Sequence, residues 1–175
     1  MSVTALGILK IPTITRNWWR IEMENNHIFI KYDEGKVILC ENNNVITTIY
    51  CSNRDIDDVF FVLKNIVAKK DGMFVDATDI KIINSGKTVR VTSATAIGEE
   101  CIVQVFQKAF LNLGVIQNSC MLLLIDNDVP LNALVQFDKI LDDETVFGKD
   151  GTIIWNVSYS EKSGKTAKLI AIIFS

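Results

Sequence analysis

The sequence predicts an α+β fold with a β-rich N-terminal segment, and three observations carry this prediction. Residues 1–54 contain short β-prone runs separated by turn residues. From Asp55 onward, apolar residues recur at the helical spacings of three and four. After residue 87, strand patterns and helix patterns alternate, and this order is typical of helices packed on a sheet.

Four β-prone runs fill the N-terminal segment, and turn residues separate them. The first run ends at Pro12, which cannot donate a hydrogen bond to a sheet. A short loop containing Gly35 lies between the second and third runs and predicts a hairpin. Asn42 begins the next turn. The four predicted strands cover residues 3–11, 27–32, 36–40 and 45–51.

A connecting segment over residues 55–86 is predicted to be helical. Its first helix begins at Asp55 and has a regular apolar stripe. A second, shorter helix runs from Asp76 to about Ser85, and Gly86 ends it. The apolar stripe of the first helix consists of Ile56, Val59, Phe60, Leu63, Ile66 and Val67.

The remaining residues, 87–175, alternate between strands and helices. A strictly alternating run predicts a strand with one wet face, and an uninterrupted apolar run from Cys120 to Ile125 predicts a central strand buried on both faces. We expect the last two strands to form an antiparallel hairpin. The predicted strands are residues 87–93, 120–125, 153–159 and 167–174, and the predicted helices are residues 98–113 and 131–141.

Composition narrows the class of protein. With 175 residues, of which 49% are hydrophobic and 22% charged, the chain can bury a proper core in one compact domain. The net charge of −3 and the pI near 5.2 disfavour a nucleic-acid surface, and no basic run is longer than Lys69-Lys70.

Cysteine usage predicts a reduced, cytoplasmic protein without a metal site. Cys40, Cys51, Cys101 and Cys120 lie in or beside apolar runs and form no Cys-x-x-Cys motif, while His27 is the one histidine. No apolar run approaches the roughly 20 residues of a membrane helix. We therefore expect no metal, no cofactor and no membrane.

Four segments, in the same order along the chain, resemble the C-terminal domain of the FtsZ/tubulin family. Residues 57–67 are similar to the end of the family's central helix. Residues 75–80 (Val-Asp-Ala-Thr-Asp-Ile) resemble its acidic loop, Asn-Val-Asp-Phe-Ala-Asp-Val. Residues 96–100 (Ala-Ile-Gly-Glu-Glu) resemble the Ala-Ser-Gly-Glu-Asp that opens the next helix, and residues 153–172 are similar to the last hairpin.

The resemblance implies a mixed sheet with helices packed on one face, a two-layer sandwich. It also implies a missing GTP-binding domain, because the signature Gly-Gly-Gly-Thr-Gly-(Ser/Thr)-Gly occurs nowhere. The expected organisation is a β-rich segment at 1–54, a connecting helix and acidic loop at 55–86, and the FtsZ-like sandwich at 87–175.

Asp76 and Asp79 are the leading candidate residues and admit two interpretations. As structural groups, they stabilise the N-terminus of the second helix. By resemblance, they form a loop that activates GTP hydrolysis in trans, on nucleotide held by another protein. Phe74, which stands where the family has Asn, and the pair Trp18 and Trp19 are further interaction candidates. Because adjacent strand residues face opposite sides, we expect one of the two tryptophan rings to lie in the core.

Other motifs are interpreted as structural. Gly164-Lys165-Thr166 and Gly86-Lys87-Thr88 lack the additional glycine of a phosphate loop and precede strands, so both are predicted turns. Asp126 and Asp128 are interpreted as solvated loop acids, without the spacing of a calcium loop.

The functional hypothesis is that this protein lacks its own nucleotide site and binds a cytoskeletal or cell-division polymer through protein contacts. Its expected partners are an FtsZ/tubulin-like protein or further copies of itself, with no nucleic acid. Two alternatives remain open: a small-molecule-binding domain or enzyme on the same fold, and a homodimeric scaffold.

Overall fold

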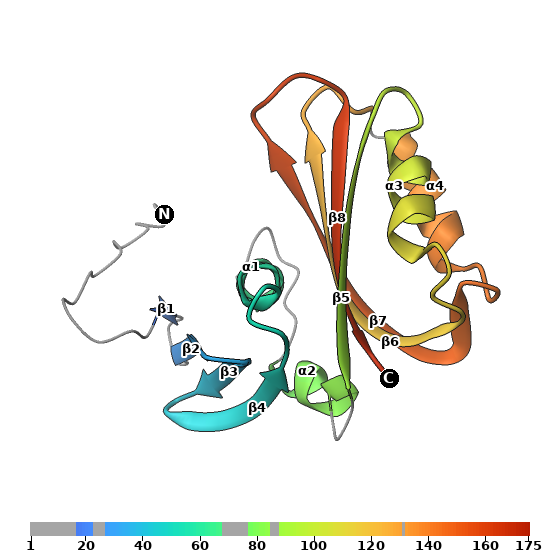
Figure 1. Ribbon diagram of the computed structural model, residues 1–175. Helices are drawn as coiled ribbons and strands as arrows, with labels where there is room; N and C mark the ends of the chain where they lie inside the picture. Colours follow the sequence, from blue (N-terminus) through green and yellow to red (C-terminus); the bar gives the residue numbers. More distant parts are fainter. Residues whose placement is uncertain (1–16, 23–26, 68–76, 85–87, 131) are drawn as a thin grey trace.

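The computed structural model describes residues 17–22, 27–67, 77–84, 88–130 and 132–175. These residues form two four-stranded sheets and four helices (Figure 1). The elements are β1 (Asn17–Glu22), β2 (His27–Asp33), β3 (Lys36–Glu41), β4 (Asn44–Tyr50), α1 (Ile56–Val67), α2 (Ala77–Asn84), β5 (Val89–Ile97), α3 (Cys101–Phe110), β6 (Ile116–Asp126), α4 (Ala133–Leu141), β7 (Phe147–Ser160) and β8 (Thr166–Phe174).

The N-terminal strands form their own antiparallel sheet in the order β1-β2-β3-β4. The predicted hairpin around Gly35 is confirmed: Asp33 pairs with Lys36, and Gly35 has φ 70°, a left-handed conformation that glycine adopts without strain. Asn42 and Asn43 also have positive φ, which asparagine tolerates better than most residues, and they turn the chain into β4. The strand predicted over residues 3–11 lies outside the described residues.

The C-terminal sheet is mixed, with strand order β5-β8-β6-β7. β6 and β7 pair in parallel, whereas β8 runs antiparallel to both of its neighbours, β5 and β6. The predicted central position of residues 120–125 is confirmed, because β6 is paired on both sides and is buried along most of its length.

The predicted hairpin of the last two strands is wrong. β7 pairs with β6, and β8 inserts between β5 and β6, so β7 and β8 are not neighbours. The physical reason lies in the composition of β8: residues 169–174 are all buried, and such a continuous apolar run gains most from a central position covered on both faces. An edge position beside β7 would leave part of that surface in water.

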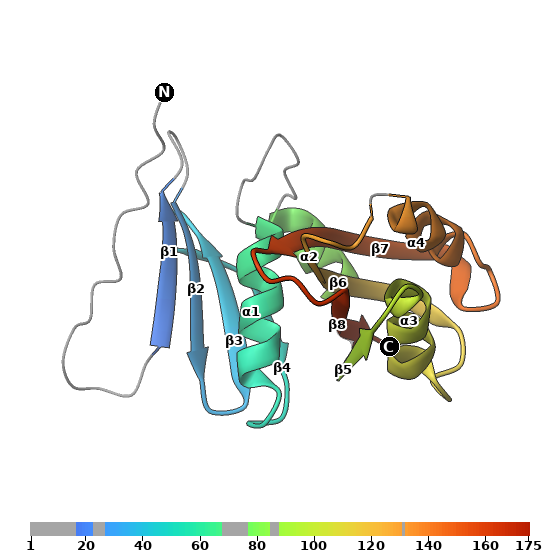
Figure 2. The ribbon, with the colours of Figure 1, turned by 90° about the horizontal axis from the view of Figure 1, so that it is seen from above.

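Helices α3 and α4 cover one face of this sheet, as Figure 2 shows from above. Each helix connects two strands of the same direction, and crossovers of one hand that progress in one direction across a sheet place their helices on the same face. Phe106 of α3 and Phe137 of α4 meet at 5.1 Å between ring centroids, over a sheet surface that includes Met121. The predicted α+β fold with a mixed sheet is confirmed, and the two helices of residues 87–175 lie on one face of that sheet.

Helix α1 lies between the two sheets and joins them into one core (Figures 1 and 2). Leu63, at the middle of the helix, is 0% exposed. The core contains residues from the N-terminal sheet, such as Ile30, and residues from the C-terminal sheet, such as Leu122 and Ile172. The C-terminal sheet is therefore covered on both faces, by α3 and α4 on one and by α1 on the other.

Candidate functional site

Helix α2 carries the described part of the predicted acidic site. Asp79 lies in the first turn of the helix and is exposed. Ile82 follows three residues later and is 64% exposed, so a carboxylate and an apolar side chain share one side of the helix. This arrangement presents a small, mixed surface to solvent.

Two buried residues hold α2 in place. Ile80 is 0% exposed and belongs to the core that joins the sheets. The Asn84 side-chain amide donates to Thr47 Oγ1 at 2.8 Å and to the Thr48 carbonyl at 2.9 Å. Because both contacts are made by the inner side of the helix, the outer side with Asp79 has a fixed orientation against β4.

The other predicted interaction residues are only partly described. Phe74 and Asp76 lie outside the described residues. Trp18 and Trp19 belong to β1, where Trp18 pairs with Lys31 and Trp19 with Ile30. The role of the two tryptophans in an interface stays a prediction.

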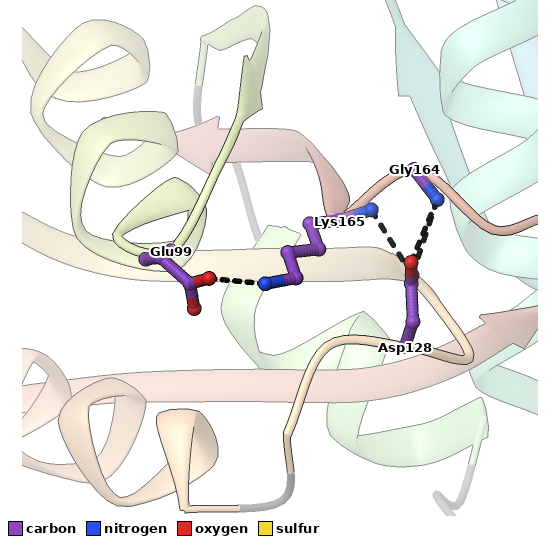
Figure 3. A network of polar contacts seen from close by, with 4 residues as sticks. All are labelled: Glu99, Asp128, Gly164 and Lys165. Atoms are coloured by element: carbon purple, nitrogen blue, oxygen red, sulfur yellow. Dashed lines mark hydrogen bonds and ion pairs between the residues drawn. The ribbon is translucent and has the colours of Figure 1, made fainter.

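A polar network lies at the end of the C-terminal sheet that is opposite to α2 (Figure 3). Its residues were not predicted to come together. Asp128 accepts hydrogen bonds from the backbone N–H groups of Gly164, at 3.0 Å, and of Lys165, at 3.0 Å. The Lys165 ammonium group forms an ion pair with Glu99, and the Lys165 carbonyl accepts a bond from the Gly98 N–H at 3.0 Å. Residues from three separate loops therefore meet where β5 and β6 end and β8 begins.

This network fixes the turn before β8. Lys165 has φ 47°, which is unfavourable for a residue with a Cβ atom, and the surrounding bonds hold it there. Asp126, which is 7% exposed, accepts from the Thr166 N–H at 3.2 Å. The predicted turn at Gly164-Lys165-Thr166 is confirmed, whereas Asp126 and Asp128 are hydrogen-bonded groups of this turn and not merely solvated acids. Their carboxylates serve the position of β8.

Charges in the network stabilise one another. Hydrogen bonds from the backbone N–H groups of Lys165 and Gly164 lower the pKa of Asp128, with the bond from Lys165 as the largest cause. The hydrogen bond and charge of Glu99 raise the pKa of Lys165. Both groups are thus held in their charged forms.

The lowered pKa of Asp128 predicts an acid-sensitive turn. A carboxyl group with a lowered pKa in the folded state adds stability above its ordinary pKa of 3.8, and this stability is lost as the pH falls through the folded value. We expect the amide signals of Gly164 and Lys165 to follow this titration below pH 3.8 in NMR spectra. The substitution Asp128→Asn should abolish that response.

Asp143 supplies an internal control for this titration. Its pKa is also lowered, mainly by the hydrogen bond from the Thr145 side chain. In the Asp128→Asn variant, the Thr145 amide should still titrate. If the Gly164 amide signal shifts equally with pH in the variant and in the original protein, the response does not come from Asp128 and the prediction is wrong.

Three of the described thiols lie in surroundings that disfavour reactivity. Burial raises the pKa of Cys51, Cys101 and Cys120, which disfavours the nucleophilic thiolate. His27 is exposed at the start of β2. Within the described ranges, no three His, Cys, Asp or Glu residues are placed to hold a metal ion. In the same ranges, no helix has the length and apolar character needed to cross a membrane.

The fold of this chain has counterparts among solved structures. No protein-family model and no curated protein sequence matches the chain. An empty FtsZ dimer from M. jannaschii matches with a TM-score of 0.53 and 16% identity, over 70% of this chain and 38% of the FtsZ chain. A W319Y mutant of M. jannaschii FtsZ matches with a TM-score of 0.52 and 14% identity, over the same shares of the two chains.

The chain has an FtsZ-like fold. At this level of identity the likeness concerns the fold alone. The chain spans 38% of the length of each of these FtsZ chains, which is consistent with a partial FtsZ-like domain.

Proposed function

We propose that the chain corresponds to the C-terminal domain of FtsZ or tubulin and binds a cytoskeletal or cell-division polymer, in the cytoplasm, without a nucleotide site of its own. The exposed side of α2 carries this proposal, because Asp79 and Ile82 face solvent there while Ile80 and Asn84 are buried. The partner is an FtsZ/tubulin-like protein or another copy of the chain.

The placement of α2 favours it over the sheet as the docking surface. Both faces of the C-terminal sheet are covered, by α1 on one and by α3 and α4 on the other. Helix α2 lies instead at the end of the sheet where β5 begins, and its outer side is open (Figure 1). An acidic group on a helix that packs on the core has the fixed orientation that docking to a second protein requires.

In the proposed complex, Asp79, together with Asp76, faces nucleotide bound by the partner. A carboxylate near a γ-phosphate can orient and polarise the attacking water, so its contribution is geometric and electrostatic. The chain has no GTP-binding signature to complete a second site. A subunit of this kind joins one end of a filament and blocks further growth there.

The test is sedimentation of the purified protein with FtsZ from its own organism, with and without GTP. We expect nucleotide-dependent co-sedimentation or a smaller amount of polymer. The double substitution Asp76→Ala with Asp79→Ala should abolish this effect and alter the partner's GTPase rate. It should leave the fold intact, because losing a helix-capping group costs about 0.5–2 kcal/mol.

The matched control replaces two acids at the start of a different helix. Asp57→Ala with Asp58→Ala removes the same charge from the first turn of α1 and should leave co-sedimentation unchanged. If the variant Asp76→Ala with Asp79→Ala changes neither the affinity for the partner nor the partner's GTPase rate, the proposed loop mechanism is wrong. A discrete dimer that is indifferent to FtsZ would instead support the homodimeric scaffold.

A further inference from the structure

A groove of about 530 Å³ lies between the C-terminal half of α4 and the outer strand β7. The helix contributes Asp138 and Leu141 to its wall, and Asp142, the C-cap of the helix, contributes a second carboxylate. The strand contributes alternate residues of one face, Gly151, Ile153 and Trp155. The open groove thus combines the apolar side chains of Leu141, Ile153 and Trp155 with two carboxylates.

The aromatic floor is held firmly. The Trp155 ring packs against Phe137 of α4 in an edge-to-face arrangement, with 4.7 Å between ring centroids and an interplanar angle of 77°. Phe137 itself is 1% exposed. Trp155 is only partly buried and lines the groove, so its ring offers a rigid aromatic surface to an occupant.

The electrostatics of the groove favour a cation. Asp138 and Asp142 are exposed and four residues apart, and they line the same side of α4. The C-terminal end of a helix adds a partial negative charge at the same place. Residues 138–150 contain five acids and two lysines, Lys139 and Lys149, so the surrounding segment is acidic as well. A cation over a tryptophan ring gains further from the negative face of the ring.

The neighbouring strand edge indicates a protein occupant. Among the described strands β7 pairs with β6 alone, and its outer edge extends along the floor of the groove. An extended segment can add to such an edge through main-chain hydrogen bonds. The Val157 N–H already donates to the Asn156 side chain at 2.8 Å, and the Thr152 N–H donates to the Asn118 side chain of β6 at 3.2 Å. Because successive N–H groups of a strand alternate in direction, Gly151, Ile153 and Trp155 are left for pairing at the outer edge.

We propose that this groove binds a lysine or arginine side chain of a partner protein, whose extended segment adds to the outer edge of β7. The basic side chain lies over Trp155, between the carboxylates of Asp138 and Asp142. The partner is therefore basic at this contact. The proposal does not depend on the role of α2, which is held against β4 by Asn84 and carries the proposed filament contact.

The first experiment is an NMR titration with a blocked heptapeptide of alternating threonine and lysine. The expected result is a set of shifts at the amides of Gly151, Ile153 and Trp155 and at the Trp155 indole N–H. The same peptide with glutamate in place of lysine should produce none of them. Equal shifts with the glutamate peptide, or no shifts at millimolar lysine peptide, would overturn the proposal.

A charge-matched pair of variants tests the site. The substitution Asp138→Asn with Asp142→Asn should weaken binding of the lysine peptide about tenfold, as expected for the loss of two exposed ion pairs. The control, Asp33→Asn with Glu34→Gln, removes the same charge from the hairpin between β2 and β3 and should bind as the original protein does. Equal weakening in both variants would mean general attraction to an acidic protein and would refute a specific groove.

Spermidine distinguishes a protein segment from a small polyamine. It supplies the positive charge but no backbone to pair with β7, so it should shift the Trp155 indole weakly and leave the Gly151 and Ile153 amides unchanged. If spermidine reproduces the full pattern of shifts at the same concentration as the peptide, the groove is a polyamine site and the proposed partner segment is wrong.

Discussion

Replacing Gly151 by alanine should lower the free energy of unfolding by about 2–4 kcal/mol, because the added methyl group has no room. A Cβ atom at this position would lie 2.0 Å from the carbonyl oxygen of Gln117 and 2.8 Å from its carbonyl carbon. Both atoms belong to the backbone of β6, at the irregularity between Ile116 and Asn118 where β6 and β7 change register. Relief of the clash therefore requires separation of the two strands.

Gly148 provides the matched control for this variant. A Cβ atom there would also approach Gln117, at 2.5 Å, but it would meet the side-chain amide, which can rotate away. Gly148→Ala should therefore lose much less stability in urea denaturation. Similar losses for the two variants would show that the backbone contact at Gly151 is not the reason for glycine in this position.

The substitution Leu63→Ala should destabilise both sheets together, by about 2–5 kcal/mol. Leu63 is 0% exposed on α1, in the core shared by the two sheets. Because the helix packs on both, a cavity at this position weakens both contacts. Unfolding should remain a single transition, with equal loss of hydrogen-exchange protection at Ile30 in β2 and Ile172 in β8.

Phe61 is the control position on the same helix. It is 38% exposed, so Phe61→Ala removes less buried surface and should cost much less. Two separate transitions in Leu63→Ala, with only the N-terminal sheet destabilised, would contradict a common core. In that case residues 17–50 would behave as an independent unit.

Local patterns in the sequence predicted the elements well and their non-local pairing less well. The stripe from Ile56 to Val67 indicated α1, and the glycine at position 35 indicated the first hairpin, since both signals act between near neighbours. The position of β8 depends on its pairing with β5, in which Val89 lies opposite Phe174, 85 residues later in the chain. A sequence reader who pairs adjacent strands therefore predicts a hairpin with β7.

The candidate sites also divide into features set by near neighbours in the sequence and features set by distant residues. The exposure of Asp79 agrees with its place in the first turn of a helix. The network of Glu99, Asp128 and Lys165 was missed because its members lie in three different loops. Only the strand order shows that these loops meet at one end of the sheet. The groove beside Trp155 was missed for a related reason, since it exists only once α4 is packed on β7.

The central position of β8 has a consequence for the synthesis of the protein. Every other described strand leaves the ribosome before β8, yet β8 separates β5 from β6. Until residues 166–174 emerge, the edges of β5 and β6 lack their common neighbour, and unpaired strand edges are prone to pair with other chains. The nascent chain therefore passes through a stage in which its C-terminal sheet lacks an inner strand, and the Asp128 hydrogen bonds that hold the turn before β8 cannot form until Gly164 and Lys165 have emerged.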